Sequence, residues 1–87
     1  MPRASQVAKE SARYQAELRA LGRRIRALRQ ARSWTLEQAS EASDIDLKHW
    51  QKVESGLINI TMVTLVRIAE GLGEPMASLF TTTKRKA

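Results

Sequence analysis

The 87-residue sequence has no cysteine and a single histidine, His49, and these shortages exclude several classes of function. Without cysteine the chain has no disulfide framework, no thiolate zinc site and no thiol nucleophile, and it suits a reducing compartment. One histidine leaves few means of metal binding or general acid–base catalysis. A glycine-rich phosphate loop is also missing. We therefore expect no enzyme, no metal site and no cofactor.

Long apolar runs are missing too. No stretch approaches the roughly 18–20 apolar residues that a membrane-spanning helix needs. The first ten residues, MPRASQVAKE, lack the apolar segment of a secretory signal. A chain of this length can form one small helical core but not a core with a deep substrate cavity. We expect one soluble, intracellular domain with no membrane partner.

Positive charge is abundant and unevenly distributed. The net charge is +6, made up of +7 in residues 1–32, −4 in residues 33–80 and +3 in residues 81–87. Basic ends on a small chain favour a polyanionic partner. The acidic middle segment argues in the opposite direction.

Residues 35–56 carry the pattern of two short helices joined by a tight turn. Thr35, with a glutamine three residues later, forms a capping-box pattern. Asp46 can cap a second helix over residues 47–54, and Gly56 suits a left-handed helix end. Two helices of about two turns joined by about four residues have the size of a helix-turn-helix.

Apolar residues at helical spacing predict further helices on both sides of this pair. The first covers residues 18–32; another follows a cap at Thr61 and ends at Gly71 and Gly73; a last short helix begins at Pro75. The expected core side chains, in chain order, are Leu21, Ile25, Leu28, Trp34, Trp50, Val53, Met62, Leu65, Ile68, Ala69, Leu72, Met76, Leu79 and Phe80. Leu36, Ala39 and Ala42 follow helical spacing after the Thr35 cap.

The order and spacing of five segments resemble the λ-repressor/Cro-like, Xre-type helix-turn-helix domains. The segments are LGRRIRALR at 21–29, WTLEQAS at 34–40, IDLKHWQKVESG at 45–56, LVRIAEGLG at 65–73 and the closing Leu79-Phe80. The resemblance implies an all-α, five-helix DNA-binding domain over residues 18–80. It also implies a sequence-specific transcriptional regulator, cytoplasmic and of bacterial or phage type, nucleoid-associated when bound to DNA.

The expected mode of action is that of a homodimer on a palindromic operator in double-stranded DNA. A recognition helix at about residues 46–54 would lie in the major groove. The side chains expected to read bases are Leu47, Lys48, Gln51 and Lys52. Lysine can donate to guanine, glutamine can pair with adenine, and leucine can contact the methyl group of thymine.

Phosphate contacts are expected at the starts of the second and fourth helices and after the third, as the resemblance implies. These positions are Thr35, Leu36, Ser55, Asn59 and Thr61. Some of the first-helix arginines are expected to reach further phosphates; the candidates are Arg19, Arg23, Arg24 and Arg26, of which Arg23 and Arg24 are preferred. Arg29 and Glu54 match a partly buried ion pair of the family, whose implied role is to lock the first helix to the third.

Residues 1–17 form a basic extension for which three interpretations stay open. They are a solvated tail, a basic arm along DNA, or a lengthened first helix. The helical interpretation rests on an apolar stripe from Val7 through Tyr14 to Leu18, which only Ser11 interrupts. The basic residues 81–87 are expected to be a loose tail.

Two departures from the family pattern weaken the expectation of conventional operator binding. Leu36 stands where many members have a phosphate-contacting glutamine. Asp44 stands where the turn usually has glycine, so either the aspartate adopts an unusual conformation or the turn is longer. The alternative function is a protein-interaction module or antitoxin on the same fold, with weak or no specific DNA binding and a protein partner.

Overall fold

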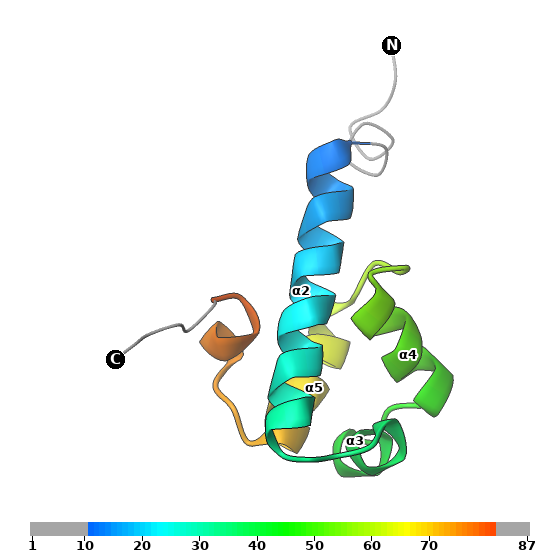
Figure 1. The fold of residues 1–87 in the computed structure, drawn as a ribbon, viewed down its shortest axis with the longest axis vertical. Helices are drawn as coiled ribbons and strands as arrows, with labels where there is room; N and C mark the ends of the chain where they lie inside the picture. The colour runs from blue at the N-terminus through cyan, green and yellow to red at the C-terminus, as the bar shows by residue number, and fades with distance from the viewer. Residues whose placement is uncertain (1–10, 82–87) are drawn as a thin grey trace.

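The computed structural model describes residues 11–81, and the segments of the chain beyond them, including Val7 and the basic residues 84–86, lie outside the described residues. Four α-helices and one 3₁₀ helix follow one another (Figure 1): α2 Ala12–Ala31, α3 Leu36–Ser43, α4 Leu47–Ser55, α5 Met62–Leu72 and η1 Met76–Leu79. Residues 11–81 contain no strand, so the all-α prediction is confirmed.

The predicted count of five α-helices is not confirmed, because the last element is η1. Pro75 precedes it in extended conformation. The amides of Ser78 and Phe80 donate to the carbonyl groups of Pro75 and Ala77, three residues back. Four residues closed by bonds of this spacing make a single 3₁₀ turn.

Helix α2 is the longest element, and the other elements pack around its lower half (Figure 1). It begins directly after Ser11, whose hydroxyl accepts a hydrogen bond from the Tyr14 amide at 2.9 Å. The residue that interrupts the apolar stripe is therefore the N-cap of the helix. Leu18, Leu21 and Ile25 face the core. None of the helices in residues 11–81 is long and apolar enough to cross a bilayer.

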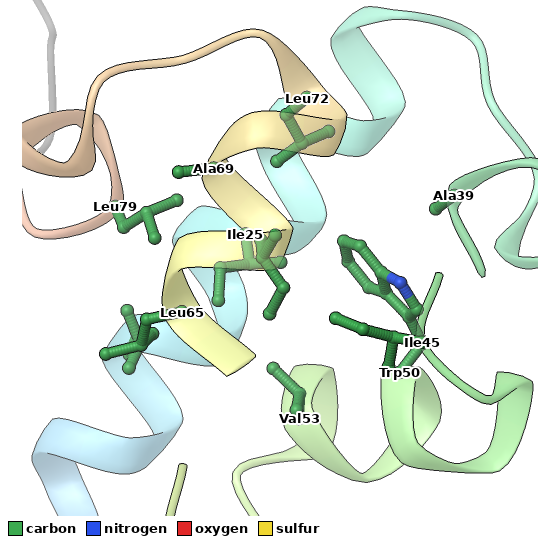
Figure 2. Close-up of a cluster of buried hydrophobic side chains, with 11 residues drawn as sticks. Ile25, Ala39, Ile45, Trp50, Val53, Leu65, Ala69, Leu72 and Leu79 are labelled. Atoms are coloured by element: carbon green, nitrogen blue, oxygen red, sulfur yellow. The ribbon is translucent and has the colours of Figure 1, made fainter. Parts of the chain in front are cut away.

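The core is built around Trp50, the largest fully buried side chain of the described residues (Figure 2). Its indole N–H donates to the Ser43 hydroxyl at 2.7 Å, and that hydroxyl donates to the Ala39 carbonyl at 2.6 Å. A buried indole N–H needs such a partner. The first of these bonds joins α4 to the end of α3, and the second holds the Ser43 hydroxyl within α3.

Two residues predicted to be buried, Met62 and Phe80, are exposed instead, and so is Ala42, which follows the helical spacing of Leu36 and Ala39. On α3, Ser43 rather than Ala42 turns inward, because it receives the Trp50 indole. Met62 is the first residue of α5 and lies at the edge of its buried face. Leu79, the residue before Phe80, is buried in the core, whereas Phe80 remains 48% exposed.

The end of α5 also differs from the prediction. Gly71 lies inside the helix, and Gly73 alone adopts the left-handed conformation that ends it, with φ of 69°. A Cβ atom on Gly71 would lie 2.8 Å from the Cα of Ser43. Gly71 therefore allows α5 to pack closely on α3.

Helices α2 and α4 touch through their backbones at Gly22. A Cβ atom added there would lie 2.5 Å from the carbonyl oxygens of both Val53 and Glu54. Gly56 repeats this approach one turn later, where a Cβ would lie 2.9 Å from the Cα of Arg19. Two glycines thus set the distance between the two helices.

Replacing Gly22 with alanine should destabilise the protein, although alanine is the better helix former by about 1 kcal/mol. The methyl group has no space beside two fixed carbonyl groups, so we expect a loss of about 1–3 kcal/mol in the free energy of unfolding. Urea denaturation followed by circular dichroism measures it. Ala27→Gly, on the exposed side of α2, is the control for helix propensity alone. Equal or greater stability of Gly22→Ala would refute the close contact.

The end of α2 is tied to the segment before η1 by Arg32 and Glu74. Arg32 Nη2 donates to Glu74 Oε2 at 2.9 Å, and Arg32 Nη1 donates to the Leu28 carbonyl at 3.0 Å. The hydrogen bond from Arg32, helped by one from Ser78, lowers the pKa of Glu74 from its ordinary value of 4.5. The ionised carboxylate therefore stabilises the folded state above that value, and this contribution is lost as the pH falls.

Glu74→Gln should consequently be less stable than the native protein at neutral pH, by up to about 1 kcal/mol because the pair is partly exposed. The difference should vanish as the pH drops below the lowered pKa of Glu74 and both proteins carry a neutral side chain. Thermal melts of both proteins between neutral and acidic pH provide the measurement. A difference that stays constant over this range would show that the carboxylate charge is irrelevant.

Candidate nucleic-acid interface

Local hydrogen bonds hold both the start of α3 and the turn between α3 and α4. The capping box at the start of α3 is formed, with the Thr35 hydroxyl accepting from the Gln38 amide at 3.1 Å and Gln38 Oε1 accepting from the Thr35 amide at 2.8 Å. Asp44 ends α3 in the left-handed conformation, with φ of 56°. The Ile45 amide donates to the Ser40 carbonyl at 3.1 Å, and the Ser40 hydroxyl donates to the Ile45 carbonyl.

Of the two possibilities for Asp44, the unusual conformation is therefore the one present. Left-handed backbone is tolerated by aspartate better than by most residues other than glycine. The turn keeps its short length, and α4 begins at once after its N-cap, Asp46. The Asp46 carboxylate accepts the Lys48 amide at 3.0 Å.

Helix α4 presents one face to the core and the other to solvent. Trp50 and Val53 are buried. Lys48, Gln51 and Lys52 are exposed, and Leu47 at the start of the helix is half-buried. Neither lysine forms an ion pair within residues 11–81. The four residues predicted to read bases thus lie on α4, and the three polar ones are free to reach outward.

The predicted phosphate contacts lie at three element ends. Thr35 and Leu36 are at the start of α3. Ser55 is the last residue of α4, and Asn59 lies in the loop that follows. Thr61 caps α5. The Ser55 hydroxyl donates to the Gln51 carbonyl at 2.8 Å, and the Thr61 hydroxyl accepts from the Thr64 amide at 3.2 Å. The amides at the starts of α3 and α5 carry the partial positive charge that attracts phosphate.

The arginines of α2 divide between two sides of the helix. Arg24 is half-buried, and its Nε donates to the Leu79 carbonyl at 2.8 Å, so it is directed toward η1. Arg23 and Arg26 are exposed. Arg19, also exposed, has its backbone against Gly56 at the end of α4. The structure therefore brings Arg19, rather than Arg24, next to the predicted phosphate contacts.

This position of Arg19 follows from the helix register. Gly22 lies opposite Val53 and Glu54, and one helical turn away Arg19 lies opposite Gly56. The sequence contains the corresponding signal, a glycine on each helix at compatible spacing. That signal becomes readable only once the two helices are known to run past each other in contact.

Arg29 and Glu54 form a two-bond ion pair between α2 and α4. Arg29 Nε lies 2.6 Å from Glu54 Oε2, and Nη2 lies 3.0 Å from Oε1. Nη1 donates to the Trp34 carbonyl at 2.8 Å, which adds the start of α3 to the junction. The hydrogen bond with Glu54 raises the pKa of Arg29, against the opposing effect of burial. Paired in this way, the guanidinium can be buried without an unpaired charge.

The remaining polar groups near α4 are His49 and an acidic hollow. His49 is half-buried, and its Nε2 has no hydrogen-bond partner among the described residues. Glu41, Asp44 and Asp46 line a hollow of about 320 Å³ beside the turn. Within residues 11–81 no three His, Cys, Asp or Glu side chains are grouped to hold a metal ion.

Comparisons with known proteins agree with this geometry. A protein-family model described as a helix-turn-helix domain matches residues 20–79. A similar solved structure is the high-resolution crystal structure of the restriction-modification controller protein C.AhdI from Aeromonas hydrophila. It is 31% identical, with a TM-score of 0.73, and the match covers 75% of this chain and 98% of that chain. A comparison with curated proteins found no match.

Glu54→Ala should lower the melting temperature, because it leaves the Arg29 guanidinium buried without its carboxylate. We expect a loss of about 3–5 kcal/mol in the free energy of unfolding. Glu41→Ala, which removes an exposed carboxylate, is the matched control and should change little. The double variant Arg29→Met/Glu54→Leu should be more stable than Glu54→Ala, because no buried charge remains. A melting temperature unchanged by Glu54→Ala would rule out a stabilising pair.

Proposed function

The chain belongs to the helix-turn-helix domain family, with the λ-repressor/Cro-like, Xre-type pattern, and from this we propose that it is a sequence-specific transcriptional regulator that binds duplex DNA. The observation that carries the proposal is the division of α4. Trp50 and Val53 anchor the helix in the core, while Lys48, Gln51 and Lys52 stand exposed along its other face. A short, firmly seated helix with polar side chains outward fits the major groove.

In the proposed complex, α4 enters the major groove and its exposed face reads the bases. Lys48 and Lys52, one turn apart, donate to guanine O6 or N7, and Gln51 pairs with an adenine. Leu47, at the start of the helix, contacts a thymine methyl. The Arg29–Glu54 pair and the Gly22 contact hold α4 in position, so little conformational freedom is lost on binding.

Phosphate contacts position the helix in the groove. Backbone amides at the starts of α3 and α5 bind phosphate near Thr35, Leu36 and Thr61, and Ser55 and Asn59 contact the backbone beyond the end of α4. Arg19 and Arg23 add charge on the exposed side of α2. These contacts carry no sequence information, but they make the affinity depend on salt.

The operator we propose is an inverted repeat bound by a homodimer, with half-sites about one helical turn apart. One small module buries limited surface, so a pair of modules provides both affinity and length of recognised sequence. The likeness to a restriction-modification controller supports a regulatory role in a cytoplasmic, nucleoid-associated protein. The proposal contains no catalytic step.

A protein-interaction module or antitoxin on the same fold is the second candidate. The acidic hollow beside the turn favours it, because Glu41, Asp44 and Asp46 lie close to where a phosphate backbone would approach. A basic segment of a protein partner would complement these carboxylates. Binding to a protein partner, with no preference among duplexes at low salt, would support this candidate over the regulator.

Selection from a pool of random duplexes, repeated across a salt series, tests the proposal. We expect enrichment of an inverted repeat. Lys48→Ala should relax the preference at one base position of each half-site, at a cost of about 1–3 kcal/mol, whereas Arg23→Ala should weaken all sequences equally and reduce the salt slope by about 1. If both substitutions lowered affinity and left base preference intact, the exposed face of α4 would not read the bases as proposed.

A further inference from the structure

Leu57 is the most exposed of the large apolar side chains in the described residues, at 71%. It comes directly after Gly56, whose left-handed conformation ends α4. A single exposed leucine is common on protein surfaces, so exposure alone assigns Leu57 no role. Its position next to the exposed face of α4 is what distinguishes it.

The end of α4 holds the backbone of Leu57 in place. The Leu57 amide donates to the Lys52 carbonyl at 3.0 Å, and the Gly56 amide donates to the Val53 carbonyl at 3.1 Å. This pair of bonds is the Schellman type of helix end. Gly56 in turn packs on Arg19, where a Cβ atom would lie 2.9 Å from the Arg19 Cα. Leu57 therefore starts from a fixed point, on the other side of α2 from η1 (Figure 1).

This helix end leaves the Leu57 side chain without its usual apolar neighbour. In a Schellman end, the residue at the place of Leu57 commonly packs against an apolar side chain in the last turn of the helix. The corresponding positions here are Gln51 and Lys52, which are polar and exposed. Leu57 thus adjoins two of the side chains proposed to read bases, and its high exposure shows that neither covers it.

The residues around Leu57 narrow down what it can meet on DNA. Ser55 and Asn59, two residues to either side, are exposed and are proposed phosphate contacts. Between successive phosphates of a strand lies a deoxyribose, whose carbon atoms form an apolar surface. Recognition helices read base edges mainly near their N-terminal end, so the C-terminal end of α4 lies nearer the sugar–phosphate backbone. A leucine side chain cannot donate to phosphate, but it can pack on the sugar.

We propose that Leu57 packs against a deoxyribose of the operator, between the phosphates contacted by Ser55 and Asn59. The inference rests on the proposed function and adds to it an apolar contact beyond the end of α4. Such a contact releases no counterions, so it strengthens binding without changing the dependence of affinity on salt. Because the backbone of Leu57 is already fixed in the free protein, little ordering accompanies the contact.

Titrations across a salt series test the contact, with the duplex that selection enriches and with a random-sequence duplex of the same length. Leu57→Ala should bind both duplexes roughly three- to tenfold more weakly at every salt concentration, because apolar contact area is lost. Its plot of log affinity against log salt should run parallel to that of the native protein, whereas Arg23→Ala should reduce the slope. Base preference and melting temperature should stay native, because the side chain is exposed and reads no base.

Two further variants separate an apolar contact from a polar one. Leu57→Asn, which keeps a branched side chain of similar size but makes it polar, should bind as weakly as Leu57→Ala. Leu57→Met, which stays apolar, should retain most of the native affinity. Native affinity in Leu57→Ala or in Leu57→Asn would overturn the contact. A changed base preference would also overturn it, because Leu57 would then touch a base rather than a sugar.

These outcomes differ from those that test the regulator itself. If the native protein enriches an inverted repeat and Leu57→Ala binds it equally well, the sugar contact fails and the regulator stands. If the native protein enriches no sequence but Leu57→Ala weakens binding to the random duplex along a parallel line, sequence-specific regulation fails and the sugar contact stands. A native protein that binds no duplex at low salt would refute both.

Discussion

The contact between the backbones of α2 and α4 at Gly22 sets the geometry of the whole described domain. Because no side chain separates Gly22 from the carbonyl groups of Val53 and Glu54, the backbones of α4 and α2 pack directly against each other. That closeness brings Glu54 within reach of Arg29, and it places Arg19 beside Gly56. The absence of a Cβ atom on Gly22 thus sets the position of α4 relative to α2, and the ion pair between Arg29 and Glu54 stabilises it.

The turn before α4 is stabilised independently of this contact. Asp44 takes the left-handed conformation, Ser40 bonds the chain on both sides of Ile45, and the Trp50 indole reaches back to Ser43. These bonds connect α3 and α4 at short range, while Gly22 and Arg29 connect α4 to α2 at long range. The helix that we propose to read DNA is consequently fixed from two directions, and its exposed side takes no part in holding it.

Local chemistry made most of the helix boundaries predictable from the sequence. Thr35, Asp46 and Thr61 act as N-caps, and Gly56 ends α4 in the left-handed conformation, because each function depends on residues within one turn. The orientation of side chains that depends on distant packing was not predictable. Examples are the exposure of Met62, the inward turn of Ser43 and the hydrogen bond from Arg24 to the carbonyl of Leu79.

The candidate site divides in the same way. The resemblance supplied the exposed positions on α4 and the pairing partners Arg29 and Glu54, and the structure adds how they are placed. Which bases Lys48, Gln51 and Lys52 contact depends on a molecule that is not part of the fold, so those roles stay predictions. The position of Arg19 beside Gly56 could not be predicted, because it depends on the packing register of α2 and α4, which are far apart in the sequence.

The separation of the two faces of α4 has an evolutionary consequence. Substitutions at the exposed positions 48, 51 and 52 alter no core contact, so selection can change them one at a time without first restoring stability. Substitutions of Trp50, Val53 or Glu54 carry no such freedom. A lineage built on this scaffold could therefore diversify its operators rapidly while its core stayed constant, and duplicated copies in one cell could acquire separate targets through a few codon changes.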